Sequence, residues 1–293
     1  MHKKPFKLGV IGGTALMELQ LTDVKKHQPN TPFGVASARF VEGTLPGGQR
    51  VVFLPRHGIS HQIQPSAINY RAIVYGMKKL GVTHLLSISA VGSLQEEIIP
   101  GKHLVIPDQL FDQTKGIRAR TFFENGMAVH VPMGNPFCSA FRELLIQSAE
   151  LCKSDKIHPK GTLIVMEGPQ FSTRAESIFF RKTVPGAAVI GMTAQPEAAL
   201  AREAGLSYAT LCLPADYDAW REGEEVVTAD AVKAGLEGFG DVALRIISSV
   251  AANLNSVEDC NCAQSLEGFA VHTFPEARLL SEKTDILGVP REN

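Results

Sequence analysis

The stretch that decides the fold runs from Ser207 to Trp220 and reads SYATLCLPADYDAW. Residues 208–213 are β-branched, aromatic or aliphatic, a composition typical of a central strand that is covered on both faces. The apolar run then ends in two carboxylates, Asp216 and Asp218. Because open α/β sheets bind their ligands beyond the carboxyl ends of the strands, this pair is a candidate site.

An Asp-x-Asp pair has two interpretations. Acids one residue apart point to the same side of an extended chain, where they could grip a group with several N–H donors. One of them could also hold a proton if its neighbour and apolar surroundings raise its pKa. The alternative is a solvated loop with an Asx-turn, which is the commoner structure for an isolated pair.

The composition is that of a globular protein with a small partner. The chain has 293 residues, 44% hydrophobic and 20% charged, enough for one large domain or two small ones. A formal net charge of −1 gives no general attraction to nucleic acid or to anionic membranes. The first apolar run breaks at Gly12-Gly13, too early for a secretion signal or a membrane span. We therefore expect a cytoplasmic protein that binds a small molecule.

The five cysteines show no metal-binding pattern. Only Cys260 and Cys262 are close in sequence, and a Cys-x-Cys pair without a second Cys or His pair makes a poor metal site. We expect no metal and two free thiols in a late loop. A local redox bridge between the two is the alternative.

Three further strand ends carry donors for an anion. The strand over residues 7–11 runs into Gly12-Gly13-Thr14, the strand over 51–54 ends in Pro55-Arg56-His57, and the strand over 82–88 ends in residues 89–93, SAVGS. Backbone N–H groups and hydroxyls at small-residue turns suit a phosphate, and Arg is the usual planar clamp for an oxyanion. In a mostly parallel sheet these ends converge, so the sequence predicts a phosphate site. The dinucleotide fingerprint lacks its third glycine, which disfavours a Rossmann NAD enzyme.

Strands and helices alternate through the rest of the chain without a repeat or a linker, which favours one α/β domain. The loop that contains Phe171 could offer an aromatic ring for stacking on a flat heterocycle. Residues 110–123 are expected to form a loop-rich segment. Its charged residues Lys115, Arg118 and Arg120 are given no role. We expect helices over residues 68–80, 175–182, 196–205 and 228–253 and one from Asn135, and strands over 103–107, 161–166 and 187–192.

Three stretches taken together identify a family: Arg56-His57-Gly58 with Pro65 and Asn69-Tyr70, Glu167-Gly168-Pro169 with Phe171-Ser172, and Met192-Thr193 with Asp216-Tyr217-Asp218. Over about residues 7–255 the chain resembles the purine nucleoside phosphorylase superfamily and, within it, the methylthioadenosine phosphorylase family. The resemblance implies a single-domain α/β fold with a mixed, twisted central sheet flanked by helices on both faces. It implies a nucleoside phosphorylase domain over residues 1–255, an extension over 256–293 that packs on the same domain or a neighbouring subunit, and a homotrimer.

The resemblance also implies roles for individual residues. The phosphate site of the family corresponds to Thr14, Arg56, His57, Ser89, Ala90 and Thr193. Met192 would lie against the sugar, His61 near the anion and the 5′ end, Phe171 and Ser172 beside the base, and Asp216 and Asp218 at N7 and the 6-amino group. The 5′ pocket would be lined by Ala229, Val232 and Lys233 and by His130 of an adjacent subunit.

The sequence departs from the family pattern at three positions. Ala15 replaces a glycine that commonly follows the Gly-Gly-Thr run, and Gln170 stands where the family often has Arg. Lys233 stands where an apolar residue is expected. Only Lys233 bears on the shape of the 5′ pocket.

The implied reaction is phosphorolysis of S-methyl-5'-thioadenosine to adenine and 5-methylthioribose 1-phosphate, with inorganic phosphate as co-substrate and no cofactor. A protonated Asp216 would serve as general acid at N7, and Asp218 would accept from the 6-amino group. Paired carboxylates favour an aminopurine, because the O6 of an oxopurine is an acceptor that they would repel. The alternatives are another purine nucleoside phosphorylase, acting on methylthioinosine, inosine, guanosine or adenosine, a phosphate-independent nucleosidase, and a non-catalytic purine-binding protein.

Overall fold

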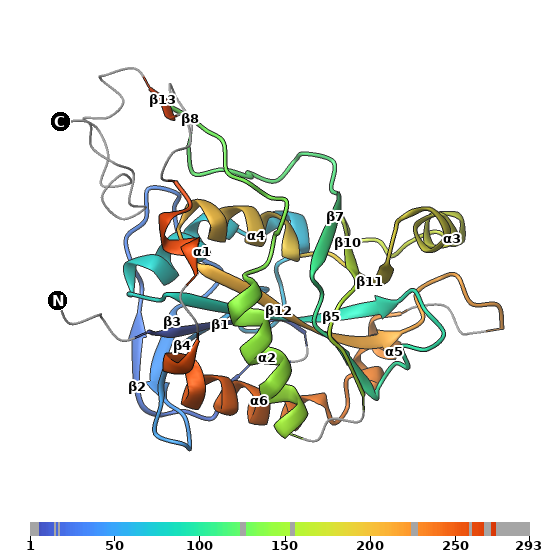
Figure 1. The fold of residues 1–293 in the computed structure, drawn as a ribbon, viewed down its shortest axis with the longest axis horizontal. Coiled ribbons are helices and arrows are strands. Elements are labelled where there is room, and N and C mark those ends of the chain that lie inside the picture. Colours follow the sequence, from blue (N-terminus) through green and yellow to red (C-terminus); the bar gives the residue numbers. More distant parts are fainter. Residues whose placement is uncertain are drawn as a thin grey trace.

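The computed structural model describes residues 6–14, 16, 18–123, 127–152, 156–223, 228–257, 260–266 and 271–273. Within them an 11-stranded sheet forms the centre of the molecule, in the order β2-β3-β4-β1-β5-β11-β10-β7, with β12 added on β5, β6 on β12 and β9 on β6 (Figure 1). The strands of this sheet are β1 (Leu8–Gly12), β2 (Thr22–His27), β3 (Phe40–Thr44), β4 (Arg50–Pro55), β5 (His84–Ser93), β6 (His103–Val105), β7 (Gln109–Gln113), β9 (Lys156–His158), β10 (Thr162–Met166), β11 (Ala187–Gly191) and β12 (Ser207–Asp216). β8 (Met127–Val129) and β13 (Val271–Thr273) form a separate antiparallel pair.

Strand β5 is the axis of the sheet. It is long enough to pair with β1 at its start, with β11 at its end and with β12 along its length. The β1 and β12 pairings are parallel and the β11 pairing is antiparallel, so the sheet is mixed, as predicted. The β12 pairing places Cys212 opposite Ser89 and Asp216 opposite Gly92. The two candidate sites therefore lie along one strand.

Helices cover both faces of the sheet (Figure 1). Helices α1 and α4 pack on one face around a core that includes Ile73 and Leu200, and α2 and α6 pack on the other around Phe141 and Ile246. The predicted α/β class with helices on both faces is confirmed. The helices are α1 (Tyr70–Lys79), α2 (Ser139–Leu151), α3 (Arg174–Thr183), α4 (Ala194–Glu203), α5 (Ala229–Gly235) and α6 (Phe239–Asn253), with 3₁₀ turns η1 (Pro65–Ala67), η2 (Leu254–Ser256) and η3 (Asn261–Gln264).

Three sequence predictions about the elements were wrong. The single helix expected over residues 228–253 is two helices, because Gly238 adopts a left-handed φ of 84° between them. The segment expected as a loop contains β7, whose exposed and half-buried residues alternate without a strongly apolar face. Strands β2 and β3 were not predicted, and β2 reads TDVKKH with almost every side chain exposed. β2 lies at the edge of the sheet and buries almost nothing, so the sequence pattern, which detects burial, gives no signal for it. β3 lies inside the sheet and buries Phe40, but its other side chains do not form a continuous apolar run.

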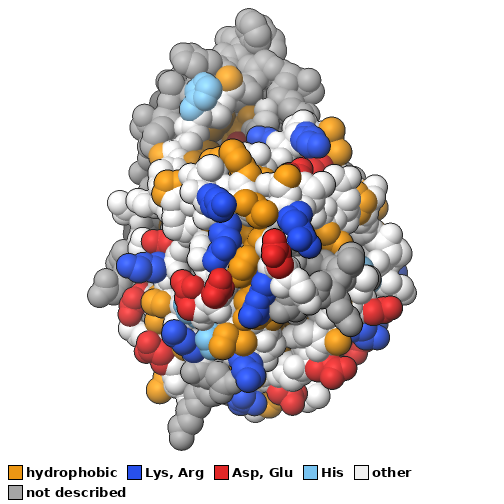
Figure 2. Space-filling model, turned by 90° about the vertical axis from the view of Figure 1, so that its right-hand side faces the viewer, with side chains coloured by type: hydrophobic (Ala, Val, Ile, Leu, Met, Phe, Trp, Pro, Cys, Tyr) orange, Lys and Arg blue, Asp and Glu red, His pale blue; other side chains and the backbone are white. Residues whose placement is uncertain are grey.

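The surface near α3 and α5 is mixed in charge. Figure 2 shows basic and acidic side chains interspersed with apolar ones on that face. Among the described residues, no helix combines the length and the apolar character that crossing a bilayer requires. The division of the chain at residue 255 stays a prediction.

Candidate active site

The ends of β1 and β4 and the middle of β5, three parallel strands, form the first half of the site. β1 lies between β4 and β5, and the Gly12 carbonyl accepts a hydrogen bond of 2.9 Å from the backbone N–H of Arg56. A Cβ atom at Gly13 would lie 2.9 Å from Arg56 Nη1 and 2.7 Å from the carbonyl oxygen of Ile88. Such contacts are too short, so only a glycine at position 13 lets this turn lie so close to Arg56 and Ile88. The three segments therefore meet as predicted, but the third is not a strand end: β5 runs to Ser93, so residues 89–93 belong to the strand that was expected to end at residue 88.

The Arg56 side chain is buried, and protein acceptors surround its guanidinium. Nη1 donates to Ser89 Oγ and to the Ile88 carbonyl, each at 3.2 Å, and Nη2 donates to Ser87 Oγ at 2.5 Å. Nε lies 2.8 Å from Oε1 of Glu197, and both side chains are 1% exposed. The positive charge of Arg56 is thus matched inside the protein, and burial makes the two charges depend on each other.

His57 is held as a neutral imidazole next to that arginine. Its Nδ1 lies 2.8 Å from the carbonyl oxygen of Ile63, which makes Nδ1 the protonated nitrogen. Burial, and then the charge of Arg56, lower the pKa of His57 to about 3. His61 stacks on His57 with ring centroids 4.3 Å apart, and burial and Arg56 lower its pKa as well. Nε2 of His57 therefore remains an acceptor, suited to a protonated oxygen of an anion.

Two hydroxyls lie beside Arg56 and His57 in this cluster. Ser89 Oγ and Thr193 Oγ1 are 3.5 Å apart, and both residues are buried. Ala90 follows Ser89 on β5, and Thr14 lies at the exposed edge of the turn after β1. The residues predicted for a phosphate site thus lie around the ends of β1 and β4, the middle of β5 and the start of α4. Ala15, the first departure noted in the sequence, lies outside the described residues.

The two carboxylates lie at the end of β12, against β5. The backbone N–H of Asp218 donates to Asp216 Oδ1 at 2.7 Å, and Asp218 has a φ of 52°. This is the Asx-turn that the sequence allowed, but it is not a solvated loop: Asp218 is buried and Asp216 is half-buried. A Cβ atom at Gly92 would lie 3.0 Å from Asp216 Oδ1 and 3.0 Å from Asp218 Cβ. The lack of a side chain at Gly92 gives both acids their place beside the strand.

Burial makes both acids easier to protonate. It raises the pKa of Asp216 to about 6, opposed by the Asp218 N–H and reinforced by the Asp218 carboxylate. Burial also raises the pKa of Asp218, against the hydroxyls of Ser177 and Ser172. Asp218 Oδ2 is buried and has no hydrogen-bond partner of good geometry among the described side chains. A buried acceptor without a donor is the position where a ligand N–H group would fit.

The loop before α3 carries Phe171 and brings Ser172 to these acids. Thr173 and Glu176 form a capping box that fixes the first turn of α3. Ser172, just before the cap, is buried and faces Asp218, whereas Phe171 is 39% exposed. The ring of Phe171, on the residue before Ser172, is therefore available for contact with a ligand.

Comparison with known proteins gives one consistent result. The sequence profile of the phosphorylase superfamily matches residues 7–252. The chain belongs to the phosphorylase superfamily. It is 47% identical over 260 residues to S-methyl-5'-thioadenosine phosphorylase of Geobacter sulfurreducens, a match that covers 88% of this chain and 89% of that one.

Solved structures of the superfamily share the whole fold. A methylthioadenosine phosphorylase from an antarctic soil metagenomic library superposes with a TM-score of 0.86 at 39% identity, covering 98% of this chain and 100% of that one. A methylthioadenosine phosphorylase from Schistosoma mansoni in complex with adenine gives 0.80 at 35% identity, covering 90% and 96%. The family resemblance seen in the sequence is confirmed.

Arg118 was given no role in the sequence analysis, and Glu197, the partner of Arg56, was not selected there. The buried guanidinium of Arg118 donates to Glu167 Oε1 at 2.8 Å and to the carbonyls of Met192 and Gln195 at 2.5 and 2.8 Å. It also bonds to the Glu167 carbonyl. One side chain thus holds the loop before α3 to the end of β11, where Met192 packs on Gly168. No local signal identifies Arg118, because its acceptors are backbone groups of distant segments.

The residues expected around a 5′ group lie on two separate elements. Helix α5 begins at Ala229 and packs so closely on β12 that a Cβ atom at Gly235 would lie 2.0 Å from the Ala215 carbonyl oxygen. Val232 of this helix is half-buried and Lys233 is exposed. His130 follows β8 and is also exposed.

Proposed function

We propose that this chain is a pentosyltransferase that converts S-methyl-5'-thioadenosine and inorganic phosphate to adenine and 5-methylthioribose 1-phosphate. The observation that carries the proposal is the buried Oδ2 of Asp218, which has no donor of good geometry among the described side chains, beside Asp216 with its raised pKa. The 6-amino group of adenine would supply that donor, whereas the O6 of an oxopurine would bring a second acceptor. The names of the relatives support this choice of base.

On the base side, Asp216 acts as the general acid. Adenine leaves poorly as an anion, so a proton delivered at N7 lowers the barrier as the glycosidic bond opens. A pKa of about 6 leaves part of Asp216 protonated near neutral pH, and Asp218 sustains that proton with its charge. Asp218 accepts from the 6-amino group, Ser172 lies at the edge of the base, and Phe171 stacks on its face.

On the phosphate side, the anion is both the nucleophile at C1′ and the counter-charge to a ribosyl cation-like transition state. Thr14, Ser89, Thr193 and the backbone at Ala90 donate to the anion. His57 accepts from its remaining O–H through Nε2. Arg56 shapes this cluster through Ser89 and turns Nη1 toward the Gly13 loop. Because Glu197 neutralises much of the Arg56 charge, the electrostatic attraction between Arg56 and the anion is reduced.

The sugar lies between these two groups. Met192, fixed by Arg118 through its carbonyl, supports the ribose, and His61 lies toward the 5′ end. Val232 and Lys233, with Ala229 at the start of the helix, form one wall of the 5′ pocket. The family resemblance supports a homotrimer, in which His130 of an adjacent subunit would form the other wall. The proposal includes a cytoplasmic location, an extension over 256–293 that packs on the domain or on a neighbour, and no cofactor besides phosphate.

The test is a rate measurement with and without phosphate. Purified protein is mixed with S-methyl-5'-thioadenosine, and adenine release is followed while phosphate is varied from zero to saturation. We expect no release without phosphate, and 5-methylthioribose 1-phosphate as the second product. Methylthioinosine, inosine, guanosine and adenosine are run in parallel and should react more slowly.

Each other outcome contradicts a different part of the proposal. Release that does not depend on phosphate would identify a nucleosidase. Preferred release of hypoxanthine or guanine would overturn the assignment of Asp218 to an amino group, and preferred cleavage of adenosine would overturn the 5′-methylthio assignment. Binding without turnover would leave a purine-binding protein.

A further inference from the structure

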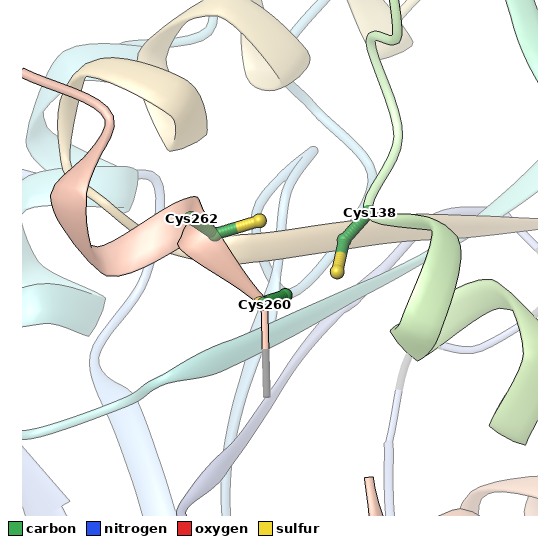
Figure 3. Close-up of side chains that lie close together, drawn as sticks. All are labelled: Cys138, Cys260 and Cys262. Carbon is green, nitrogen blue, oxygen red and sulfur yellow. The ribbon is translucent and has the colours of Figure 1, made fainter. Parts of the chain in front are cut away.

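The end of β12 opposite the carboxylates carries a cluster of three thiols. Cys138 precedes α2, whereas Cys260 and Cys262 lie in the segment around η3 (Figure 3). The three sulfur atoms all lie within 4.8 Å of one another, and none is in a disulfide. Figure 3 shows the sulfurs of Cys138 and Cys262 directed toward the space between the three residues. The sequence pattern missed the cluster because Cys138 is far from the other two along the chain.

We infer that Cys138, Cys260 and Cys262 form a trigonal three-thiolate site for a soft d¹⁰ metal ion such as Cu(I). Three sulfurs each about 2.3 Å from a central ion lie about 4 Å apart. The observed separations are at most 4.8 Å, so a small closing movement is sufficient. Thiolate ligands select soft ions, and among the described residues no fourth His, Cys, Asp or Glu joins the cluster. A trigonal ion therefore fits better than structural zinc, which takes four ligands.

The backbone around the thiols is already fixed. The N–H of Cys138 donates to the Tyr208 carbonyl at 2.8 Å. On the other side, a Cβ atom at Gly205 would lie 3.3 Å from the carbonyl oxygen of Cys262, so the η3 segment lies directly on the turn before β12. Ser265 Oγ also bonds to the Arg202 carbonyl. Preorganised ligands lose little conformational freedom when an ion binds.

Polar groups around the sulfurs support a charged site. Ser207 Oγ lies 3.2 Å from Cys260 Sγ and can donate to a thiolate there. His84, which pairs with Ser207 across β5 and β12, interacts electrostatically with Cys260. Its Nε2 is buried and has no hydrogen-bond partner among the described residues. Cys138 and Cys262 are buried, whereas Cys260 is half-buried, so the ion would enter past Cys260.

The test is a competition for Cu(I) in the full chain. Protein is reduced, freed of reductant under nitrogen and titrated against a coloured Cu(I) complex of bicinchoninate. We expect wild-type protein to remove one Cu(I) per chain from the chelator. Cys138→Ser, Cys260→Ser and Cys262→Ser should each weaken the affinity by at least about tenfold, because loss of one soft ligand leaves two.

The other two cysteines are matched controls. Cys152→Ser and Cys212→Ala change thiols outside the cluster and should leave Cu(I) uptake unchanged. X-ray absorption of the wild-type copper protein, which needs no variant to fold, should show three sulfur neighbours. Failure of the wild type to compete, equal loss in Cys152→Ser, or coordination by two sulfurs alone would overturn the site. Loss of two thiols to a disulfide in air, without Cu(I) uptake by the reduced form, would also overturn it.

Discussion

Two pairs of buried charged side chains lie along β5, and they are built in opposite ways. Arg56 and Glu197 carry opposite charges 2.8 Å apart, and serine hydroxyls, a carbonyl and the hydroxyl of Tyr208 bond to them. Asp216 and Asp218 carry like charges, and Asp218 Oδ2 has no partner of good geometry among the described residues. The residues they touch on β5, Ser89 and Gly92, are about 10 Å apart.

The difference indicates that the ion pair stabilises the fold and that the acid pair takes part in the reaction. A buried ion pair whose members satisfy each other fixes the strand ends and resists change. A buried pair of acids cannot be satisfied by itself, so one member gains a proton and the other keeps a free acceptor. Only the acid pair can therefore exchange a proton with a ligand near neutral pH. If this comparison is correct, substitutions at the two pairs should affect different measurements.

The largest expected effect is on catalysis at the acid pair. Asp216→Asn keeps the shape of the side chain and its hydrogen bond from the Asp218 N–H but removes the transferable proton. We expect kcat for S-methyl-5'-thioadenosine to fall by about 10²–10⁴, the usual contribution of a general acid. KM should change little, because the interaction is made in the transition state. Steady-state kinetics at saturating phosphate measures both constants.

The same substitution should leave stability nearly unchanged or slightly increased, since it removes a buried charge that has no cation partner. Thermal unfolding of Asp216→Asn is the control for this point. A variant with wild-type kcat would remove Asp216 from the mechanism, and a variant that unfolds early would place the acid pair with the structural pair.

The next largest effect is on stability at the ion pair. Arg56→Met leaves Glu197 as a buried charge without its cation, so we expect the free energy of unfolding to fall by about 3–5 kcal/mol. The double variant Arg56→Met/Glu197→Met should recover most of this, less about 1 kcal/mol for the Tyr208 hydroxyl that loses its acceptor. Urea denaturation measures all three proteins.

Arg50 provides a matched control for this prediction. Arg50 Nη2 lies 3.8 Å from Glu42 Oε1, and the Arg50 side chain is 44% exposed; Glu42 is half-buried but keeps Lys7 as a second cation partner. Arg50→Met should cost less than about 1 kcal/mol. Equal losses at Arg50 and Arg56 would mean that burial of the Arg56–Glu197 pair contributes nothing to the fold.

The sequence predicted the parts of the fold that burial organises. The apolar runs of β1, β4, β5 and β12 and the apolar faces of α1 and α6 were found, because each buries a continuous hydrophobic surface. The exposed edge strand β2 was missed, and the break at Gly238 was not seen because an isolated glycine in a helical pattern does not fix a helix end. Edges and breaks depend on neighbours that the local sequence does not contain.

The candidate site divides in the same way. Residues at strand ends, such as Arg56 and Asp216, could be selected because their position in the β-loop-α pattern is visible in the sequence. Ser89 was selected for the same reason, although β5 continues past it to Ser93. Glu197 and Arg118 could not be selected in this way. Glu197 is one charge within an alanine-rich helix, and Arg118 bonds mostly to carbonyl groups, which every residue has. Such residues become visible only when the chain is folded.

The smallest expected effect is on the pH dependence of the reaction, which tests how the two acids of the pair influence each other. In the free enzyme, kcat/KM reports the ionisation of the essential acid, and protonated Asp216 is the active form. Because burial raises the pKa of Asp216 to about 6, kcat/KM should fall as pH rises through about 6. His57, with a pKa of about 3, stays neutral between about pH 5 and 8 and cannot produce this limb.

Asp218→Asn removes the neighbouring carboxylate, whose charge raises the pKa of Asp216. The falling limb of kcat/KM should therefore move to lower pH, even though the absolute rate also decreases with the lost acceptor for the 6-amino group. The profile is measured from about pH 5 to 8 at fixed ionic strength, so that screening stays constant. Ser177→Ala is the opposite control. It removes a hydroxyl that lowers the pKa of Asp218, so the acid pair should bind its proton more tightly and the limb should not move to lower pH. A limb that stays in place in Asp218→Asn would show that the two carboxyls titrate independently. A limb that moves to higher pH would show that the Asp218 charge does not raise the pKa of Asp216. In either case Asp216 would act as a single acid, without help from the charge of its neighbour.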